Sequence, residues 1–364
     1  MKLAFLAAAN SIHSIRWIQY FSDRGHSVVW ISLAPASPEA SELIKKTAYY
    51  EISPSPLADI NGRKALLNIL PAVRDVKKIL KKEHPDVLHI HSAGTYGLIG
   101  MLSGFHPRIV TPWGSDILLA SSLFKKILIE YIVSTADALT CDGENTSKAL
   151  QEFGADTQKI SIIRFGTDVK KFEFPPRIQS TNSVIRVLSL RNIEPVYNIE
   201  TLIAAAEIVH KENTNVHFQI AGDGSERKKL ETLVQEKNLQ DVVVFSGRYT
   251  PIALPQMFGS ANIYVSTSLS DSGLSASTAE AMAAGLPVVV SDSGDNREWI
   301  KEERGGFVFP CGNAQALAED ILFLVAHPET RRQFGEYNKN LIGEKNNYWK
   351  EMEKMERIYS EIRA

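Results

Sequence analysis

A loop of small residues that runs into an alanine-rich helix is the strongest chemical feature of the sequence. It reads SLSDSGLSASTAEAMAAGLPVVVSD over residues 268–292. The N–H groups and partial positive charge of a helix amino terminus can hold a diphosphate without metal or lysine. Glu280 would lie about one turn into the helix, where its carboxylate can accept hydrogen bonds from ribose hydroxyls. The alternative is a tight helix–strand turn at Gly285–Pro287, with small residues that serve only packing.

Histidines and a polar loop in the first half offer further chemistry. His89 and His91 alternate along a predicted strand and therefore share one face, with His91 nearer its carboxyl end. His91 is thus a candidate catalytic imidazole, and the alternative is a packed, hydrogen-bonded histidine. Asn10 and Ser11 follow the first apolar run, where they can cap the next helix or contact a donor phosphate or acceptor.

Elements that position these residues are predicted from alternating apolar runs and helical periodicities. In the first half the strands are Lys2–Ala9, Ser27–Ser32, Asp86–Ser92 and Ile109–Thr111, and the helices include Ser11–Arg24 and Lys64–Lys82. In the second half the strands are Ile185–Leu190, Val216–Ala221, Val242–Ser246, Ile263–Thr267, Pro287–Ser291 and Gly306–Phe309, and the helices are Ile199–Lys211, Glu226–Lys237, Ser277–Ala284 and Ala314–Ala326. Strands separated by helices predict two doubly wound α/β domains.

Ligands of such domains bind at the carboxyl ends of the strands. The loops expected to carry function are therefore Ala9–Ser14, His91–Tyr96, Pro112–Ile117, Leu190–Asn198, Gly222–Arg227 and Ser268–Ser277. The proline-containing, polar segment Glu173–Ser183 predicts a linker between the domains. A stripe of Trp349, Met352, Met355, Tyr359 and Ile362 predicts a terminal helix, which in the simplest interpretation packs on its own domain.

Six segments in the same order resemble retaining glycosyltransferase family 4. EAMAAGLPVV, followed by a glycine and Glu298 in SDSGDNREWI, resembles the carboxy-terminal signature of the family. The others are DVLHIHS, RFGTDVKKF, AGDGSERKKLE, FSGRYTPIALPQMFGSANIYVSTS and NNYWKEMEKMERIYSEI. The resemblance implies a GT-B fold of two Rossmann-like domains that face a central cleft. Residues 1–173 would bind the acceptor, residues 174–346 the nucleotide-sugar, and the terminal helix 347–364 would cross back to the first domain.

The resemblance also implies roles for individual residues. Arg191 would neutralise the leaving diphosphate, which suits a guanidinium because it stays charged and can bind phosphate oxygens bidentately. Glu280 would hold the donor ribose, and Asp116 would be catalytic together with His91. The remaining donor residues would be Gly222, Asp223, Gly224, Asp271, Ser272, Gly273, Leu274 and Ser275. The acceptor or phosphate loops would supply Asn10, Ser11, Arg16, Gly114 and Ser115.

The sequence departs from the family's pattern at three positions. Tyr197 and Asn198 stand where the family usually has a lysine after the arginine. Ser272 stands where the first acid of the paired-glutamate motif is expected, with Asp271 one residue earlier. Trp113 stands in TPWGSD where the family often has a histidine. We therefore expect one positive charge for the diphosphate to be missing, and the imidazole to come from elsewhere or to be dispensable.

The resemblance implies transfer of a hexose or N-acetylhexosamine from a nucleotide-sugar, a UDP-sugar in the first instance, with retention at the anomeric carbon. The acceptor would be a glycan, a lipid-linked or a small molecule. No cofactor is implied, and because no Asp-x-Asp motif occurs where a GT-A enzyme binds a divalent ion, no metal is expected. Two alternatives remain: a nucleotide-sugar 2-epimerase of GT-B architecture and a non-catalytic nucleotide-sugar-binding subunit.

Composition indicates which partners and which cellular location the protein has. The formal charge of the 364 residues is −2, which argues against a nucleic-acid partner. Two distant cysteines and the lack of an apolar run long enough to cross a bilayer favour a cytoplasmic protein. Lysines on two predicted helices suggest peripheral contact with the inner face of an anionic membrane. They are Lys77, Lys78, Lys81 and Lys82 on one helix, and Lys125 and Lys126 on another with Ile127, Leu128 and Ile132 behind them. The alternative is a solvated helix face.

Overall fold

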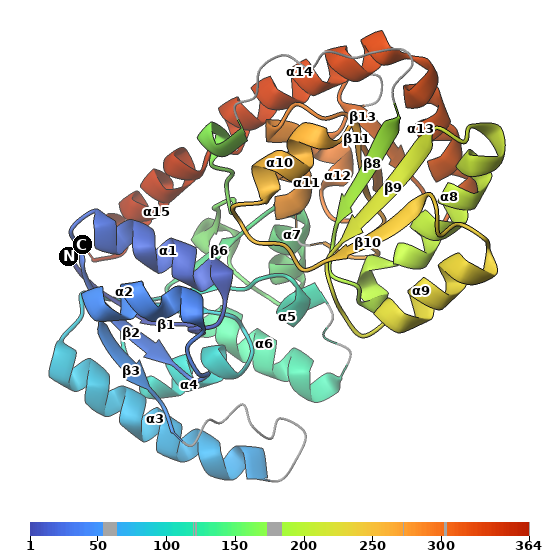
Figure 1. The fold of residues 1–364 in the computed structure, drawn as a ribbon. Helices are drawn as coiled ribbons and strands as arrows, with labels where there is room; N and C mark the ends of the chain where they lie inside the picture. Colours follow the sequence, from blue (N-terminus) through green and yellow to red (C-terminus); the bar gives the residue numbers. More distant parts are fainter. Residues whose placement is uncertain are drawn as a thin grey trace. The chain divides into compact units, whose positions relative to one another are not determined.

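Two compact units make up the chain, each built on one parallel sheet (Figure 1). The computed structural model describes residues 1–53, 64–118, 120, 122–172, 184–271, 273–301 and 304–363. Unit 1 comprises Met1–Phe165 and Lys350–Ala364, and unit 2 comprises Gly166–Trp349. The predicted linker Glu173–Ser183 lies outside the described residues.

The sheet of unit 1 has seven strands in the order β3-β2-β1-β4-β5-β6-β7. The strands are β1 (Lys2–Leu6), β2 (Ser27–Ser32), β3 (Ala48–Glu51), β4 (Val87–His91), β5 (Arg108–Thr111), β6 (Ala138–Cys141) and β7 (Ile160–Ile162). The helices are α1 (Ile12–Asp23), α2 (Ser41–Lys46), α3 (Lys64–Glu83), α4 (Thr95–Ser103), α5 (Ser115–Leu118), α6 (Leu123–Thr135) and α7 (Glu144–Glu152). Because the order turns back between β1 and β4, the carboxyl ends of these two strands border the expected ligand crevice.

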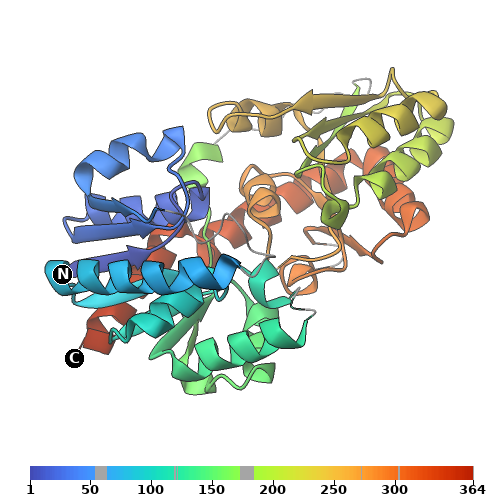
Figure 2. The same cartoon turned by 90° about the horizontal axis from the view of Figure 1, so that it is seen from below.

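Helices cover both faces of this sheet (Figure 2). Ala4 and Leu6 point to the face that α3, α4 and α6 cover, where they join one buried apolar cluster. Phe5, between them, points to the opposite face and contacts the rings of Phe21 from α1 and Tyr359 from the terminal helix. The alternation of side chains along β1 therefore fills two layers of core.

The sheet of unit 2 has six parallel strands in the order β10-β9-β8-β11-β12-β13, which is the Rossmann order. The strands are β8 (Ile185–Leu190), β9 (Val216–Ala221), β10 (Val243–Gly247), β11 (Ile263–Ser266), β12 (Val288–Ser291) and β13 (Gly306–Phe309). The helices are α8 (Ile199–Glu212), α9 (Arg227–Glu236), α10 (Leu254–Ser260), α11 (Ala276–Ala283), α12 (Asn296–Trp299), α13 (Ala314–Ala326) and α14 (Pro328–Lys345).

Two buried clusters sandwich the sheet of unit 2. Val187 and Ile220 pack with α8, α9 and α13 on one face. Leu188 and Val290 pack with α10, α11 and α14 on the other. β8 is thus buried on both sides, and its carboxyl end lies next to that of β11, where the strand order reverses.

The terminal helix α15 (Tyr348–Arg363) belongs mostly to unit 1. Met352, Met355 and Tyr359 are buried, and the Tyr359 hydroxyl lies 2.5 Å from Nδ1 of His89 in β4. Trp349, at the start of the predicted stripe, is instead 47% exposed. Residues distant in the sequence therefore complete the core of unit 1 through this helix.

Candidate active site

Arg191 follows β8 at the switch point of unit 2 and is held by three side chains. Its Nη2 donates to Asp271 Oδ1 at 2.6 Å and to Ser268 Oγ at 3.4 Å, and its Nη1 donates to Ser277 Oγ at 3.5 Å. The Arg191 side chain is 8% exposed. Burial opposes its charge, but the Asp271 carboxylate raises the pKa of Arg191 above its ordinary value. The carboxyl ends of β8 and β11 thus hold one buried, permanently charged cation.

A buried tyrosine of the sheet holds one of the side chains that bind Arg191. Tyr264 of β11 is fully buried and donates its hydroxyl hydrogen to Ser277 Oγ at 2.7 Å. Burial raises the pKa of Tyr264 to about 12, so the phenol stays protonated. Ser277, in the first turn of α11, therefore links the sheet to the guanidinium.

The predicted glycine loop packs directly against the segment that carries Arg191. A Cβ at Gly222, which has φ +152°, would overlap the carbonyl oxygen of Arg191. A Cβ at Gly224 would overlap the carbonyl oxygen of Ile193. The close approach that these glycines allow is therefore to the protein's own backbone, whatever else the loop contacts. Asp223 lies between these glycines. Its Oδ1 is 3.7 Å from Nη1 of Arg227, and its Oδ2 is 3.6 Å from Nε of Arg248.

The amino terminus of α11 continues the loop that carries Asp271. Ser275 is the N-cap of α11, and its Oγ accepts from the Thr278 backbone N–H at 3.3 Å. Gly273 and Leu274 are buried, and Ser272 lies outside the described residues. Glu280 is half-buried one turn into the helix. Burial and, second, the Glu280 charge raise the pKa of Tyr249, which indicates that these side chains lie near each other.

In unit 1, His91 ends β4 inside the protein. It is 2% exposed, and its Nδ1 lies 3.0 Å from Ser14 Oγ. Its Nε2 has no hydrogen-bond partner in the described part of the chain. Burial, followed by the charge of His13, lowers the pKa of His91 to about 3, so the imidazole is neutral near pH 7. The bonded Nδ1 agrees with a packed, hydrogen-bonded histidine, and the available Nε2 agrees with a catalytic imidazole.

The Trp113 side chain, which replaces the family's usual histidine, stacks on a histidine from another element. The rings of His13 and Trp113 lie 5.2 Å apart at 26°, and the His13 ring meets Phe165 edge-on at 4.4 Å. His13 Nδ1 is buried without a hydrogen-bond partner among the described residues. Burial and then the Arg16 charge lower the pKa of His13 to about 4. No pattern in the sequence singles out His13, because a contact between residues this far apart leaves no local signal.

Asp116 ties two loops of unit 1 together. Its Oδ2 accepts from the Ala93 backbone N–H at 2.7 Å, and its Oδ1 accepts from the Trp113 N–H at 3.0 Å. Burial raises the pKa of Asp116, although these hydrogen bonds act against that rise. The observed contacts position the loops after β4 and β5; the expected catalytic role stays a prediction. Gly114 has φ +97° in the same turn, and Ser115 is exposed at the start of α5.

The loop after β1 carries the remaining predicted residues. Ser11 is the N-cap of α1, and its Oγ accepts from the Ser14 N–H at 3.5 Å, as the capping interpretation predicts. Asn10 is exposed directly before it. The Arg16 guanidinium lies over the Phe165 ring, 4.6 Å from its centroid. Within unit 1 the predicted polar loop, His91 and Trp113 therefore meet at the carboxyl ends of β1, β4 and β5.

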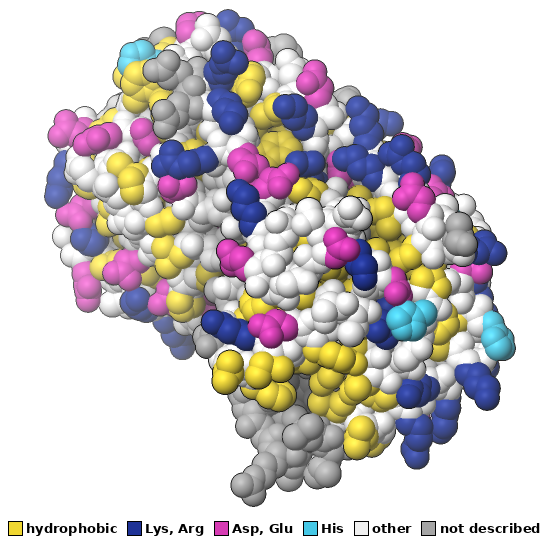
Figure 3. Space-filling view, turned by 180° about the vertical axis from the view of Figure 1, so that it is seen from behind, with side chains coloured by type: hydrophobic (Ala, Val, Ile, Leu, Met, Phe, Trp, Pro, Cys, Tyr) yellow, Lys and Arg dark blue, Asp and Glu magenta, His cyan; other side chains and the backbone are white. Residues whose placement is uncertain are grey.

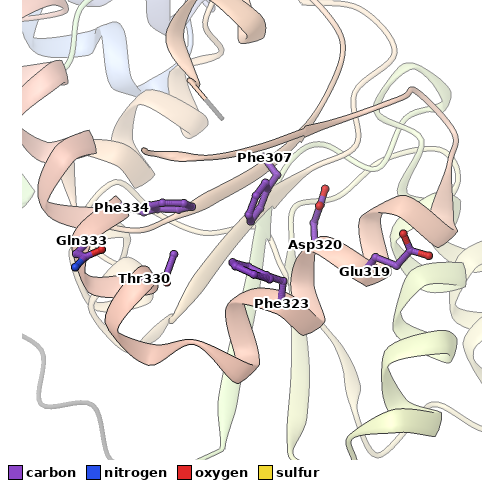
Figure 4. A pocket seen from close by; sticks show the side chains of 7 residues that line it. All are labelled: Phe307, Glu319, Asp320, Phe323, Thr330, Gln333 and Phe334. Atoms are coloured by element: carbon purple, nitrogen blue, oxygen red, sulfur yellow. The ribbon is translucent and has the colours of Figure 1, made fainter. Parts of the chain in front are cut away.

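Two cavities lie apart from the predicted site residues. One of about 510 Å³ in unit 2 is surrounded by the rings of Phe307, Phe323 and Phe334, with Glu319 and Asp320 at its side (Figure 4). The other, of about 380 Å³ in unit 1, is lined by Lys77 and Lys81 among others. In the part of the chain that the structure describes, there is no group of three or more His, Cys, Asp or Glu side chains that would hold a metal ion.

The two parallel α/β units and the carboxyl-end loops define the GT-B class of glycosyltransferases. The sequence matches the family model Glycosyl transferases group 1 over residues 170–341 and the model Glycosyl transferase 4-like over residues 2–143. The two matches together cover most of the chain, which therefore belongs to the family-4 type of glycosyltransferase that its motifs predict.

Curated relatives with similar sequences are glycosyltransferases. A putative colanic acid biosynthesis glycosyltransferase of Escherichia coli is 25% identical over 177 residues, 47% of this chain and 43% of that protein. The chain thus spans less than half the length of this relative. A phosphatidyl-myo-inositol mannosyltransferase of Mycolicibacterium smegmatis is 27% identical over 327 residues, which cover 88% of this chain and 81% of that protein.

Solved structures share the whole fold. Sucrose-phosphate synthase from Thermosynechococcus elongatus matches with a TM-score of 0.84 and 20% identity, covering 99% of this chain and 98% of that chain. HepE of Anabaena, solved in complex with UDP-glucose, matches with a TM-score of 0.83 and 16% identity, covering 99% of this chain and 100% of that chain. At these identities the likeness defines the fold alone.

Proposed function

We propose that this glycosyltransferase moves a hexose or N-acetylhexosamine from a UDP-sugar, with retention, to a glycan, lipid-linked or small-molecule acceptor. The observation that carries the proposal is the buried Arg191 cation at the switch point of unit 2, beside the capped amino terminus of α11. Anionic groups bind in such places, and a departing nucleoside diphosphate is an anion whose charge grows as the sugar bond breaks.

The proposed donor site lies in unit 2. Arg191 meets the diphosphate, Glu280 accepts hydrogen bonds from the ribose, and Gly273, Leu274 and Ser275 contact the phosphates and the sugar. The departing diphosphate takes the acceptor proton on the face that it leaves, so no protein nucleophile is required. The protein contributes positioning and electrostatic stabilisation. The UDP-glucose in the complex of HepE supports the choice of donor.

Unit 1 is proposed to bind the acceptor. His13, His91 and Trp113 form an aromatic group with neutral imidazoles, which can donate and accept hydrogen bonds to sugar hydroxyls. A relative named as a UDP-Gal:alpha-D-GlcNAc-diphosphoundecaprenol alpha-1,3-galactosyltransferase is 25% identical over 71% of this chain. Its name supports a lipid-linked acceptor as one of the three classes.

We also propose that the protein works in the cytoplasm at the inner face of the membrane. Within the described ranges, no helix combines the length and apolar character needed to span a bilayer. On α6, however, Leu123, Phe124, Ile127 and Tyr131 are 75%, 71%, 56% and 42% exposed, beside exposed Lys125 and Lys126. Figure 3 shows hydrophobic side chains gathered where α6 and α3 lie, with Lys and Arg side chains at the edge. Ile132, expected behind the lysines, is buried in the core instead.

The test is incubation with labelled nucleotide-sugars and candidate acceptors, after a thermal-shift screen of nucleotides has selected the base. Transfer to an acceptor, or slow donor hydrolysis, is expected, and it should survive EDTA because no metal is required by the proposal. An epimerised donor would favour the 2-epimerase. Tight binding without turnover would favour the non-catalytic subunit, and strict dependence on Mn²⁺ or Mg²⁺ would contradict the metal-independent mechanism.

A further inference from the structure

The loops that follow β8 and β11 offer a diphosphate a single basic side chain. Residues 188–199 contain Arg191 and no other Lys or Arg, and residues 263–285 contain none. A long side chain that binds an anion loses rotamer freedom unless it is already held in place. The orientation of Arg191 before the donor arrives is therefore decisive for the binding of the diphosphate.

Tyr197 covers one face of this arginine. The Cζ atom of Arg191 lies 4.3 Å from the centroid of the Tyr197 ring. An aromatic ring attracts a guanidinium stacked on its face and leaves the N–H edge available for hydrogen bonds in the guanidinium plane. At this edge Nη1 and Nη2 donate to Ser277, Ser268 and Asp271.

The backbone at Tyr197 is fixed to the loop that carries Asp271. The carbonyl oxygen of Tyr197 accepts from Thr267 Oγ1 at 2.8 Å, and the carbonyl oxygen of Val196 accepts from the Leu269 N–H at 2.8 Å. Asn198 then turns the chain into α8 with φ +47°. These bonds hold the backbone at Tyr197 beside the Asp271 loop, so only rotation about its own side-chain bonds moves the ring away from Arg191.

Asp271 provides the anion that Arg191 contacts. The ion pair is 2.6 Å long, and the side chains of Arg191 and Asp271 are 8% and 12% exposed. A carboxylate and a phosphate offer a guanidinium the same kind of charged acceptor oxygens. A diphosphate that binds Arg191 must therefore compete with Asp271 for the same N–H edge.

We propose that Tyr197 is a positioning residue of the donor site. Its ring keeps the Arg191 guanidinium in one plane while the N–H edge of Arg191 exchanges Asp271 for the diphosphate. The inference rests on the proposed function, because it takes Arg191 as the group that meets the diphosphate. Tyr197 stands where the family usually has a lysine, and it supports the remaining cation instead of adding a second one.

Calorimetric titration of the full chain with inorganic pyrophosphate and with UDP tests this role without knowledge of the sugar. Tyr197→Leu removes the ring face, and we expect both probes to bind about tenfold more weakly. Tyr197→Phe keeps the face and should restore the binding that leucine loses. Asp271→Asn removes the competing carboxylate and should bind pyrophosphate more tightly than the wild type. With a labelled donor, Tyr197→Leu should lower kcat while the KM for the acceptor stays unchanged.

The outcomes separate this inference from the proposed function. A wild-type chain that binds neither pyrophosphate nor any nucleotide overturns both. A wild-type chain that binds and turns over, with Tyr197→Leu indistinguishable from it, overturns the inference alone. Equal losses in Tyr197→Phe and Tyr197→Leu would also contradict it, because the ring face and not the hydroxyl is the proposed support. Thermal unfolding controls for folding, and Tyr197→Met replaces Tyr197→Leu if the leucine variant unfolds early.

Discussion

At the scale of single residues, the chemistry of unit 2 centres on a charge that the fold keeps away from water. An isolated buried charge is costly. The charge of Arg191 can be buried because Asp271, two serines and the ring of Tyr197 contact its guanidinium. A cation that is already desolvated and oriented interacts strongly with charge that develops beside it. This is the physical reason to expect Arg191 to act on the transition state more than on the ground state.

Arg191→Ala should consequently reduce kcat more than it raises the KM for the donor. Loss of one such charge contact typically lowers kcat by about 10²–10³-fold. Steady-state kinetics with the donor selected by the nucleotide screen measure both constants. An effect confined to KM would mean that Arg191 binds only the ground state. Arg297→Ala, which removes an exposed arginine of the same unit, is the control and should leave both constants unchanged.

Glu280→Ala should weaken binding of the free nucleoside by roughly 1.5–3 kcal/mol, the value of a hydrogen bond to a charged group. Because Glu280 is assigned to the ribose, binding of inorganic pyrophosphate should stay unchanged in the same variant. Calorimetry with the nucleoside and with pyrophosphate makes this comparison. Glu319→Ala, at an exposed glutamate of the same unit, is the matched control. Unaltered nucleoside affinity would remove Glu280 from the ribose site.

His91 links the site to the pH dependence of stability. Its folded pKa of about 3 lies below the ordinary value of 6.5, so the unfolded chain takes up a proton first as the pH falls. The contribution of neutral His91 to the free energy of unfolding is complete above pH 6.5, decreases below that pH and levels off near pH 3. Between pH 7 and pH 5 the loss is about 2 kcal/mol. In urea unfolding, His91→Asn should therefore lose about 2 kcal/mol less over this interval than the wild type. An unchanged pH dependence would contradict the assignment, and His84→Asn, at an exposed histidine, is the control.

At the scale of elements, backbone geometry fixes the loop that carries Arg191. Gly222 and Gly312 both have positive φ, but a Cβ at Gly312 would meet nothing within 4 Å, whereas one at Gly222 would overlap the Arg191 carbonyl. Gly312→Ala should cost about 1–2 kcal/mol of strain. Gly222→Ala should destabilise unit 2 further and weaken UDP binding, because the overlap displaces the Arg191 segment. Thermal unfolding and calorimetry compare the pair. Equal effects of the two variants on UDP binding would show that the contact with Arg191 is irrelevant.

Elements with strong local patterns are the ones that the sequence predicts. β8, β9 and β13 have the predicted bounds, since short runs of buried apolar residues bounded by turns mark them clearly. The predicted strand Lys2–Ala9 ends early, at Leu6, where the chain begins to turn toward the Ser11 cap. β3, β6 and β7 are missed, because a polar residue interrupts or ends each of these short apolar runs.

Contacts between elements lie beyond such patterns. Ser11 and Glu280 are predicted with roles that follow from their position along a helix, and the cap of Ser11 is observed. The stack of His13 on Trp113 and the cover of Arg191 by Tyr197 arise only when separate loops meet. The motifs locate the loops after β8 and β11, and the sequence alone shows Tyr197 and Trp113 where the family usually has a lysine and a histidine. The contacts of these two side chains with Arg191 and His13 become visible only in three dimensions.

At the scale of the whole molecule, the proposed contact with a membrane rests on two surface features of unit 1. Exposed apolar side chains of α6 can enter the interface, and exposed Lys77, Lys78, Lys81 and Lys82 of α3 can meet anionic headgroups. Each basic residue near an anionic leaflet contributes about 1 kcal/mol, so several together give reversible binding. Salt bridges of Lys78 with Asp75 and of Lys82 with Glu83 reduce this contribution. In the proposed contact, the exposed apolar side chains of α6 must then supply part of the attachment.

Sedimentation with liposomes separates the two contributions. We expect binding to vesicles that contain phosphatidylglycerol at low salt, weaker binding at high salt because the charges are screened, and little binding to phosphatidylcholine alone. Phe124→Ser should weaken binding at both salt concentrations, whereas Lys81→Gln should weaken it only at low salt. Phe323→Ser, at an exposed phenylalanine of unit 2, controls for loss of apolar surface in general. No binding at low salt, or equal binding to neutral vesicles, would leave the lysines as solubility charges and would favour a soluble acceptor over a lipid-linked one.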